Sequence, residues 1–203
     1  MKQKISVVII SRNDNYGGHL KERATYCLNS AIDTYDEVFY IDWNSPTHSL
    51  LYDIKDDINF KGNLKHIVIT PKVTEILTGA DPNAQVCCEV LARNIGIRRA
   101  TGDWILSSNI DIIHPSREDA EEVISKMDPD TFYTISRRNI DRDIIEKHEN
   151  FWFKDGKVDY KQWKILRSYL IDNTAGHTDP EKVVEAYNTL RKLASNKTKT
   201  PLT

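Results

Sequence analysis

Short apolar runs alternate with segments of helical periodicity along most of the chain. Runs rich in β-branched and aromatic residues predict strands at 5–10, 37–41, 64–70, 104–108 and 131–135. Apolar positions spaced by three or four residues predict helices at 19–33, 49–54, 84–100 and 116–126. Strands that alternate with helices in this way predict an α/β fold with a mostly parallel, doubly wound sheet and helices on both faces.

Two parts of the chain lack this regular pattern. Segment 72–83 contains Gly79 and Pro82 and has no clear period, so we interpret it as a functional loop or a poorly packed excursion. After residue 138 we expect a charged segment at 139–149, an aromatic cluster at 151–153 and an Asp-Gly turn at 155–156. Two helices are expected at 160–171 and 180–194, followed by a frayed polar tail at 195–203.

Composition indicates a soluble globular protein. The 203 residues fit one domain, and 39% hydrophobic with 29% charged residues excludes a disordered or membrane-spanning chain. A net charge of −2 gives no support for non-specific nucleic-acid binding. No signal peptide is recognisable, and the apolar run at 7–10 is too short to cross a bilayer. Cys27, Cys87 and Cys88 predict buried thiols in a reducing compartment, which favours a cytoplasmic location.

Polar residues follow three of the predicted strands, at 11–13, 42–45 and 109–111. Because the strands are parallel, these residues are expected at one edge of the sheet, where ligands of open α/β sheets bind. An acid at the position of Asp42 contacts the ribose or base in many nucleotide-binding folds. No glycine-rich fingerprint or Walker loop follows the first strand, which argues against a dinucleotide-binding dehydrogenase and a P-loop NTPase. A divalent cation on Asp111 would supply the countercharge for phosphates.

Four segments, in this order and spacing, resemble GT-A-type glycosyltransferases of the family 2-like sort. They are the apolar strand and polar loop 7–13, the acidic turn 42–45, the helix–turn–strand 92–105, and 109–111 in place of a D-x-D motif. The third reads A-R-N-x-G-x-x-x-A-x-G-x-W-I, and the resemblance covers about residues 4–115. The sequence is similar too to the small glycosyltransferase domains of large algal DNA viruses that decorate capsid glycans.

The resemblance implies one GT-A-like domain over 1–203, in which 1–115 binds the nucleotide-sugar and 116–194 forms the acceptor-side helical part. Its implied activity is transfer of a sugar from a UDP-sugar to a glycan or protein-linked acceptor, assisted by Mn²⁺ or Mg²⁺. The family's first D-x-D acid is Asn109 here, and His177 stands where a later acid is usual. The site residues expected are, for catalysis, Asp111, His177 and Asp81; for the metal, Asp111 and His177; and for the donor, Ser11, Arg12, Asn13, Asp42, Trp43, Arg93, Asn109 and Ile110.

Several of these residues also have a structural interpretation. Asp42 fits a turn residue that bonds its own backbone, Trp43 a core residue, and Arg93 a partner of Glu89 four residues before it. His114 is a second candidate for an extra metal ligand. At the level of function, the alternatives are a non-catalytic nucleotide- or glycan-binding module, and a nucleotidyltransferase, which normally has a basic glycine-rich loop after its first strand.

Overall fold

The computed structural model describes residues 3–81, 87–135, 153–154 and 157–158. The chain forms two compact units, Met1–Met127 and Asp128–Thr203, and each is considered by itself. In the first unit, four parallel strands form a sheet in the order β3-β2-β1-β4. Their bounds are β1 Ile5–Ser11, β2 Glu37–Trp43, β3 Leu64–Ile69 and β4 Trp104–Asn109.

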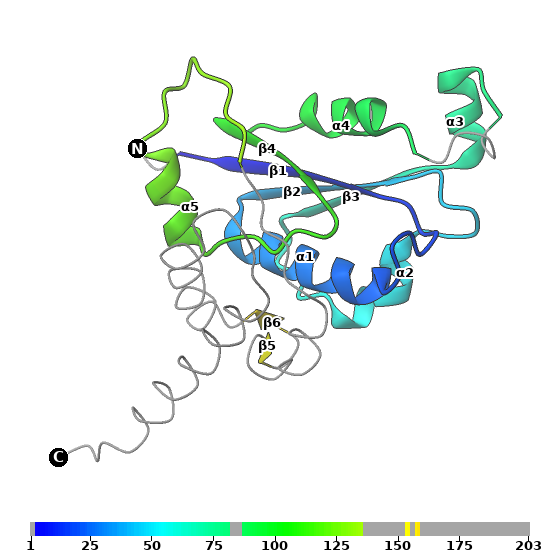
Figure 1. Ribbon diagram of the computed structural model, residues 1–203, viewed down its shortest axis with the longest axis horizontal. Helices are drawn as coiled ribbons and strands as arrows, with labels where there is room; N and C mark the ends of the chain where they lie inside the picture. Colours follow the sequence, from blue (N-terminus) through cyan, green and yellow to red (C-terminus); the bar gives the residue numbers. More distant parts are fainter. Residues whose placement is uncertain (1–2, 82–86, 136–152, 155–156, 159–203) are drawn as a thin grey trace, which may run out of the picture. The chain divides into compact units, whose positions relative to one another are not determined.

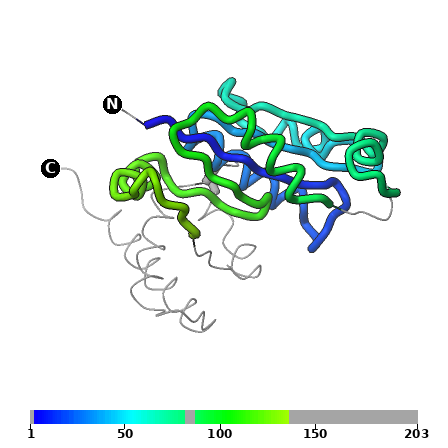
Figure 2. Tube along the Cα trace, turned by 90° about the horizontal axis from the view of Figure 1, so that it is seen from above, coloured from blue at the N-terminus to red at the C-terminus, as the bar shows by residue number. Residues whose placement is uncertain are grey.

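Helices cover both faces of this sheet (Figure 1). On one face lie α1, α2, the 3-10 turn η1 and α5, with bounds Leu20–Thr34, Leu50–Ile54, Lys55–Asp57 and Arg117–Ile124. On the other side are α3, Pro71–Thr78, and α4, Glu89–Ile97, which packs against β1 and β2 (Figure 2). The predicted α/β class with a parallel, doubly wound sheet is therefore confirmed.

The central strands β1 and β2 are buried along their whole length. Alternate β1 residues enter two separate cores, as period-two side-chain geometry requires. Val7 and Ile9 pack toward α1, whereas Val8 and Ile10 pack toward α4. Strands with both faces covered are expected to be continuously apolar, and the runs at the start of β1 and β2 have this pattern.

The helix–turn–strand motif at 92–105 brings α4 unusually close to the sheet. A Cβ atom at Gly96 would lie 2.4 Å from Cγ1 of Val8, and one at Gly102 would lie 2.7 Å from the backbone nitrogen of Ser6. Both distances are too short for any side chain, so glycine is required at both positions. Ala92, fully buried against the same core, adds to this close packing. The spacing of small residues in the motif is therefore explained by helix–strand packing.

Two predicted segments, the irregular segment 72–83 and the helix 84–100, differ from what is observed. Segment 72–83 was expected to be irregular, but α3 occupies its first part: Thr70 caps the N-terminus, Pro71 occupies the first turn, and Gly79 ends the helix in the left-handed region at φ 66°. Gly79 and Pro71 therefore mark helix ends rather than a loop. The helix predicted at 84–100 is shorter, because α4 begins only at Glu89, and 82–86 lie outside the described residues.

The predicted strand at 131–135 is wrong. These residues form no strand, and Phe132 is 91% exposed. The apolar run is short and has no neighbouring strand among the described residues to pair with. In the second unit, β5 (Phe153–Lys154) and β6 (Lys157–Val158) instead form a short antiparallel pair.

The other predictions for the C-terminal third lie outside the described residues. These are the charged segment, Phe151 and Trp152, the turn 155–156, both late helices and the tail. In the part of the chain that is described, no helix has the length and apolar character needed to cross a membrane.

Candidate functional site

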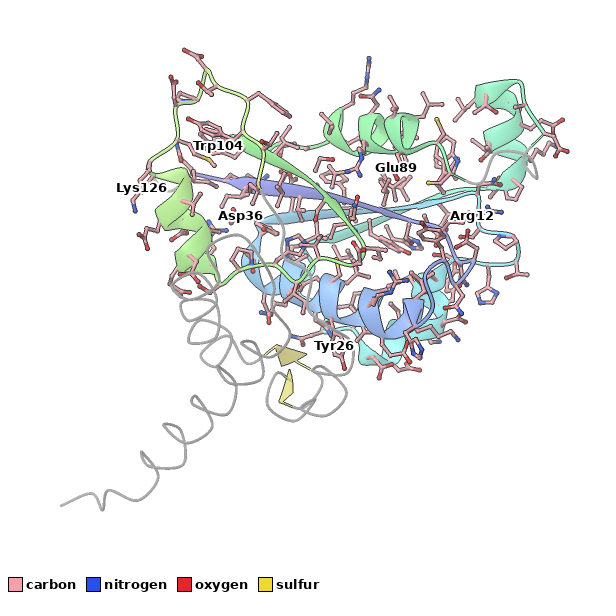
Figure 3. The ribbon with its side chains drawn as sticks, in the orientation of Figure 1. Arg12, Tyr26, Asp36, Glu89, Trp104 and Lys126 are labelled. Atoms are coloured by element: carbon pink, nitrogen blue, oxygen red, sulfur yellow. The ribbon has the colours of Figure 1, made fainter. Side chains whose placement is uncertain are left out.

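The polar residues predicted at three strand ends do lie at one edge of the sheet. Parallel register sets Ser11 of β1 beside Asp42 of β2, and Ile10 beside Asn109 of β4. Figure 3 shows Arg12 at the opposite end of the sheet from Trp104, the first residue of β4. The strand order reverses between β1 and β4, so this edge contains the crevice where open α/β sheets bind ligands.

The loops after β1 and β2 are joined by direct hydrogen bonds. Nε of Arg12 donates to the carbonyl oxygen of Asn44 at 2.8 Å, and the backbone N–H of Asn13 donates to Oγ of Ser45 at 2.8 Å. Asn44 adopts a left-handed conformation with φ 55°, which asparagine tolerates better than most residues. The guanidinium of Arg12 also lies 3.6 Å from Asp14. These contacts make the two loops one surface.

Asp42 is fully buried and holds this surface from beneath. Its carboxylate accepts hydrogen bonds from the hydroxyls of Ser45 and Ser49 and from the backbone N–H of Leu50, at 2.9 Å for the last. Tyr40 lies on its other side, with its hydroxyl 3.4 Å away. Asp42 therefore organises the turn into α2, which is the structural interpretation of this residue. Its predicted contact with a nucleotide stays a prediction.

Ser11 and His66 extend the Asp42 network. The hydroxyl of Ser11 contacts that of Tyr40, and Ser49 contacts Nε2 of His66 at 2.8 Å. Burial raises the pKa of Tyr40, and the charge of Asp42 raises it further, so the phenol stays protonated. Ser11, predicted to contact the donor, is buried within this network.

A cluster that the sequence analysis missed lies around Asp53, on the α2 side of the same edge. Asp53 accepts from Nε2 of His48 at 2.7 Å and from the side-chain amide of Asn13 at 3.3 Å, and Nζ of Lys21 lies 3.3 Å away. The hydrogen bond from His48 lowers the pKa of Asp53 and outweighs the effect of its burial. His48 is half-exposed. The spacing of His48 and Asp53, one on each side of the Ser49 N-cap, is the sequence signal that would have indicated this pair.

Arg93 braces the end of β4. One terminal nitrogen of its guanidinium contacts the Ser107 hydroxyl and the Ser108 carbonyl, and the other contacts Glu89 at 3.0 Å and Oδ1 of Asn109 at 2.6 Å. The predicted pairing with Glu89 is thus present. Because the side-chain oxygen of Asn109 accepts a hydrogen bond from Arg93, that oxygen points toward α4. Arg93 and Asn109 act together as a structural pair in this conformation.

Asp111 lies in the turn that follows β4, and its side chain is 41% exposed. Its carboxylate is 3.9 Å from the guanidinium of Arg23 in the first turns of α1. Arg23 also donates to the carbonyl oxygens of Tyr16 and Gly18, which belong to the loop after β1. Arg23 thus links the two sides of the crevice. It was not predicted as a site residue, although its position shortly after the polar loop was a usable signal.

Of the carboxylates at this edge, Asp111 has a side chain that is 41% exposed, whereas Asp14 and Asp53 are each 22% exposed and contact Arg12 and His48 respectively. Among the described residues, no group of three or more His, Cys, Asp or Glu side chains is arranged to hold a metal. His114, the second candidate ligand, is 1% exposed, and burial lowers its pKa to about 3. The donor set therefore fits a cation that shares its coordination with phosphate oxygens, and does not fit a cation held by the protein alone.

Of the other predicted residues that the structure describes, Trp43, Ile110 and Asp81 lie away from the crevice. Trp43 is fully buried in the core beneath α4, and its indole N–H has no partner among the residues that the structure describes. Ile110 packs against the core on the α1 side. Asp81 is exposed after α3, which follows β3 at the far edge of the sheet from β4. His177 lies outside the described residues.

Comparisons with known proteins add a structural likeness. No protein-family model matches the chain, and a search of curated proteins found no match. Among solved structures, the chain is similar to the crystal structure of S. aureus TarS 1-349, with 17% sequence identity and a TM-score of 0.40. The alignment covers 72% of this chain and 33% of that chain, so this chain spans about a third of its length. The fold and site themselves define an α/β protein with a polar crevice at the carboxyl edge of a parallel sheet.

Proposed function

We propose that this chain is a glycosyltransferase that takes a sugar from a nucleotide-sugar donor, a UDP-sugar, and transfers it to a glycan or protein-linked acceptor. The single observation that carries the proposal is the position of Asp111. It is an accessible carboxylate at the end of β4, beside Arg23 and the loop after β1. The ordered resemblance of residues 4–115 to GT-A-type enzymes supports the same assignment.

The donor would lie across the ends of β2, β1 and β4. Adjacent strands are about 4.8 Å apart, so β2 and β4 are separated by about 10 Å, a span that a nucleoside diphosphate bridges. We assign the nucleoside to the loops after β1 and β2, where Asn13 and His48 present polar groups. The diphosphate is assigned to the Asp111 side. Asp42 acts on the nucleoside through the loop that it organises.

Positive charge in the crevice supports an anionic ligand. The side chain of Arg23, in α1, is 30% exposed, and that of Arg12, in the loop after β1, is 16% exposed. A guanidinium forms paired hydrogen bonds with phosphate oxygens. Asp111 alone would repel a diphosphate, so the proposal assigns it to a Mn²⁺ or Mg²⁺ ion that binds together with the nucleotide.

In the proposed reaction, an acceptor hydroxyl forms a bond to the anomeric carbon of the sugar while the bond to the diphosphate breaks. Negative charge develops on the leaving diphosphate, and Arg23 lies where it would stabilise that charge. A cation held by Asp111 would supply further positive charge there. The acceptor hydroxyl must lose its proton to a base. His177 stays proposed for catalysis on the acceptor side, and Asp81, which lies after α3 at the far edge of the sheet from β4, receives no step in this reaction.

The test is UDP release from a panel of UDP-sugars, with and without Mn²⁺, after a thermal-shift screen of the same panel for binding. The account expects one donor to raise the melting temperature and to release UDP when Mn²⁺ is present. Asp111→Asn should abolish the release while keeping the melting temperature of the free protein. Release that is unaffected by Asp111→Asn would contradict the assignment.

A non-catalytic nucleotide- or glycan-binding module is the second candidate. The observation that favours it is the chemistry of the 109–111 segment: Asp111 is its one carboxylate, and the amide oxygen of Asn109 already accepts a hydrogen bond from Arg93. Such a module would be stabilised by a UDP-sugar in the thermal-shift screen but would release no UDP with any metal or acceptor.

A further inference from the structure

The segment that carries Asp111 is fastened to one stripe of α1. Arg23, Cys27, Ser30 and Thr34 follow one another at spacings of four, three and four residues, which places them on one face of the helix. Arg23 meets Asp111, Ser30 accepts from the backbone N–H of His114 at 3.0 Å, and Thr34 donates to the carbonyl oxygen of Pro115. The whole turn after β4 therefore rests on this polar stripe.

Cys27 is the centre of this stripe. Its sulfur lies 3.4 Å from the carbonyl oxygen of Asn109 and 3.8 Å from Nε2 of His114. The backbone N–H of Ile112 is near enough to lower the pKa of the thiol against the effect of burial. Asn109 and Ile112 flank Asp111 in the sequence. The side chain is fully buried, and burial raises the pKa of the thiol, so Cys27 is an S–H group.

The hydrogen-bond directions around Cys27 are mutually consistent. Tyr35 O–H donates to Nδ1 of His114 at 3.1 Å, His114 Nε2–H then donates to the Cys27 sulfur, and the thiol donates to the Asn109 carbonyl. This order requires a neutral imidazole with its proton on Nε2, and deep burial of His114 favours the neutral form. The chain of donors ends on the backbone at the last residue of β4.

From these contacts we infer that Cys27 is a positioning residue for Asp111: its thiol fixes the Asn109–Ile112 turn in the conformation that presents the Asp111 carboxylate to a metal–nucleotide complex. His114 and Tyr35 act through Cys27. The inference rests on the proposed function for its ligand, but the fixation of the turn is a property of the free protein. Cys27 itself does not coordinate the metal, because its sulfur is fully buried.

The experiment compares Cys27→Ala, Cys27→Ser and the matched control Cys88→Ser, a half-buried cysteine on the other face of the sheet. Hydrogen exchange of the Ile112 amide is measured in the free protein. UDP affinity is measured by calorimetry with Mn²⁺ and with EDTA. We expect Cys27→Ala to speed Ile112 exchange at least tenfold and to weaken Mn²⁺-dependent UDP affinity about tenfold, with the EDTA affinity unchanged. Cys27→Ser should recover part of both effects, and Cys88→Ser should change neither.

A merely structural role would lower the affinities with Mn²⁺ and with EDTA alike, and that result would overturn the inference, as would unchanged Ile112 exchange in folded Cys27→Ala. If Cys27→Ala does not fold, Tyr35→Phe removes the hydroxyl that donates to His114 and keeps the ring. It should then speed Ile112 exchange two- to fivefold, and unchanged exchange would overturn the inference. Faster exchange combined with no Mn²⁺-dependent UDP binding by the wild type would refute the proposed function while leaving the fixation of the turn intact.

Discussion

At the scale of single residues, the two strand-end acids that the sequence indicates have different roles. Asp42 is fully buried and accepts at least three short hydrogen bonds, whereas the side chain of Asp111 is 41% exposed and faces one arginine. Both acids follow an apolar strand, so the sequence pattern could not separate them. The difference arises from Ser45 and Ser49, whose hydroxyls reach back to Asp42 and enclose it. After β4, no equivalent hydroxyl among the described residues contacts Asp111.

Replacing Asp42 should therefore cost stability. Asp42→Ala leaves the hydroxyls of Ser45 and Ser49 and the N–H of Leu50 without their acceptor, and each buried unpaired group costs about 1 kcal/mol or more. We expect the free energy of unfolding in urea to fall by about 2–4 kcal/mol. The control Asp56→Ala, at an exposed acid, should change it by less than about 0.5 kcal/mol. Equal effects of the two substitutions would contradict the role assigned to Asp42.

His48 tests the nucleoside end of the proposed site. His48→Ala removes the imidazole that Asp53 orients, on a loop remote from Asp111 in the strand order. We expect UDP to bind three- to tenfold more weakly, by the same factor in Mn²⁺ and in EDTA, as measured by calorimetry. The loss of one polar contact to a ligand produces an effect of this size. A loss confined to the Mn²⁺ condition would assign His48 to the diphosphate instead.

At the scale of elements, the helix–turn–strand motif determines how α4 meets the sheet. Gly96 allows the helix backbone to approach Val8, Gly102 allows the following turn to approach Ser6, and Arg93 holds the end of β4. The motif thus acts on the crevice indirectly, through the placement of β4. Its order and spacing indicated the correct helix and strand. The described contacts of Gly96, Gly102 and Arg93 are structural, and the predicted contact of Arg93 with the donor stays a prediction.

The packing at Gly96 gives a direct test. Gly96→Ala would place a methyl group 2.4 Å from Val8, and relief of this overlap requires α4 to move from the sheet. We expect the melting temperature to fall, with a loss of about 1–3 kcal/mol in the free energy of unfolding. The double variant Gly96→Ala with Val8→Ala should be less destabilised than the sum of the two single variants. Strict additivity would show that the two positions do not meet.

Much of the fold was predictable from sequence because the apolar runs of buried parallel strands and the periodicity of amphipathic helices are local signals. The four sheet strands, α1, α2 and α5 were indicated by apolar runs and by helical periodicity. Interactions between distant segments were not. The contacts of Cys27 with residues 109–114 and of Arg23 with Asp111 join residues more than 80 positions apart, and no periodicity reports them.

At the scale of the whole molecule, Glu37 ties the sheet together at the end opposite the crevice. From the start of β2 it binds Ser6 of β1, Lys65 of β3 and Thr101 before β4. Burial alone would raise the pKa of Glu37, but the hydrogen bonds from Lys65, Ser6 and Thr101 lower it well below its ordinary range. The folded protein therefore favours the ionised carboxylate more than the unfolded chain does.

Glu37→Gln should reveal this coupling through its pH dependence. Because the folded pKa lies below the unfolded value of 4.5, the ionised group stabilises the fold above that pH, and the stabilisation is lost as the pH falls below it. We expect the free energy of unfolding in urea at pH 7 to fall by about 3 kcal/mol. This value is near the lower end of the cost of breaking a buried ion pair, because Lys65 is half-exposed. At pH 3.5 the difference from wild type should be smaller. A loss that does not depend on pH would contradict the account, and Glu118→Gln, at an exposed acid, provides the control.

The central claim concerns the crevice: we propose that Asp111 holds a cation whose coordination shell is completed by the diphosphate of a nucleotide donor. The most direct measurement is the calorimetric affinity for UDP in Mn²⁺ and in EDTA, for the wild type and for Asp111→Asn. The account predicts that Mn²⁺ strengthens UDP binding to the wild type at least tenfold, whereas Asp111→Asn binds UDP equally in Mn²⁺ and in EDTA. The two free proteins should have equal melting temperatures, because the side chain of Asp111 is exposed. Equal UDP affinities of the wild type in Mn²⁺ and in EDTA would contradict it.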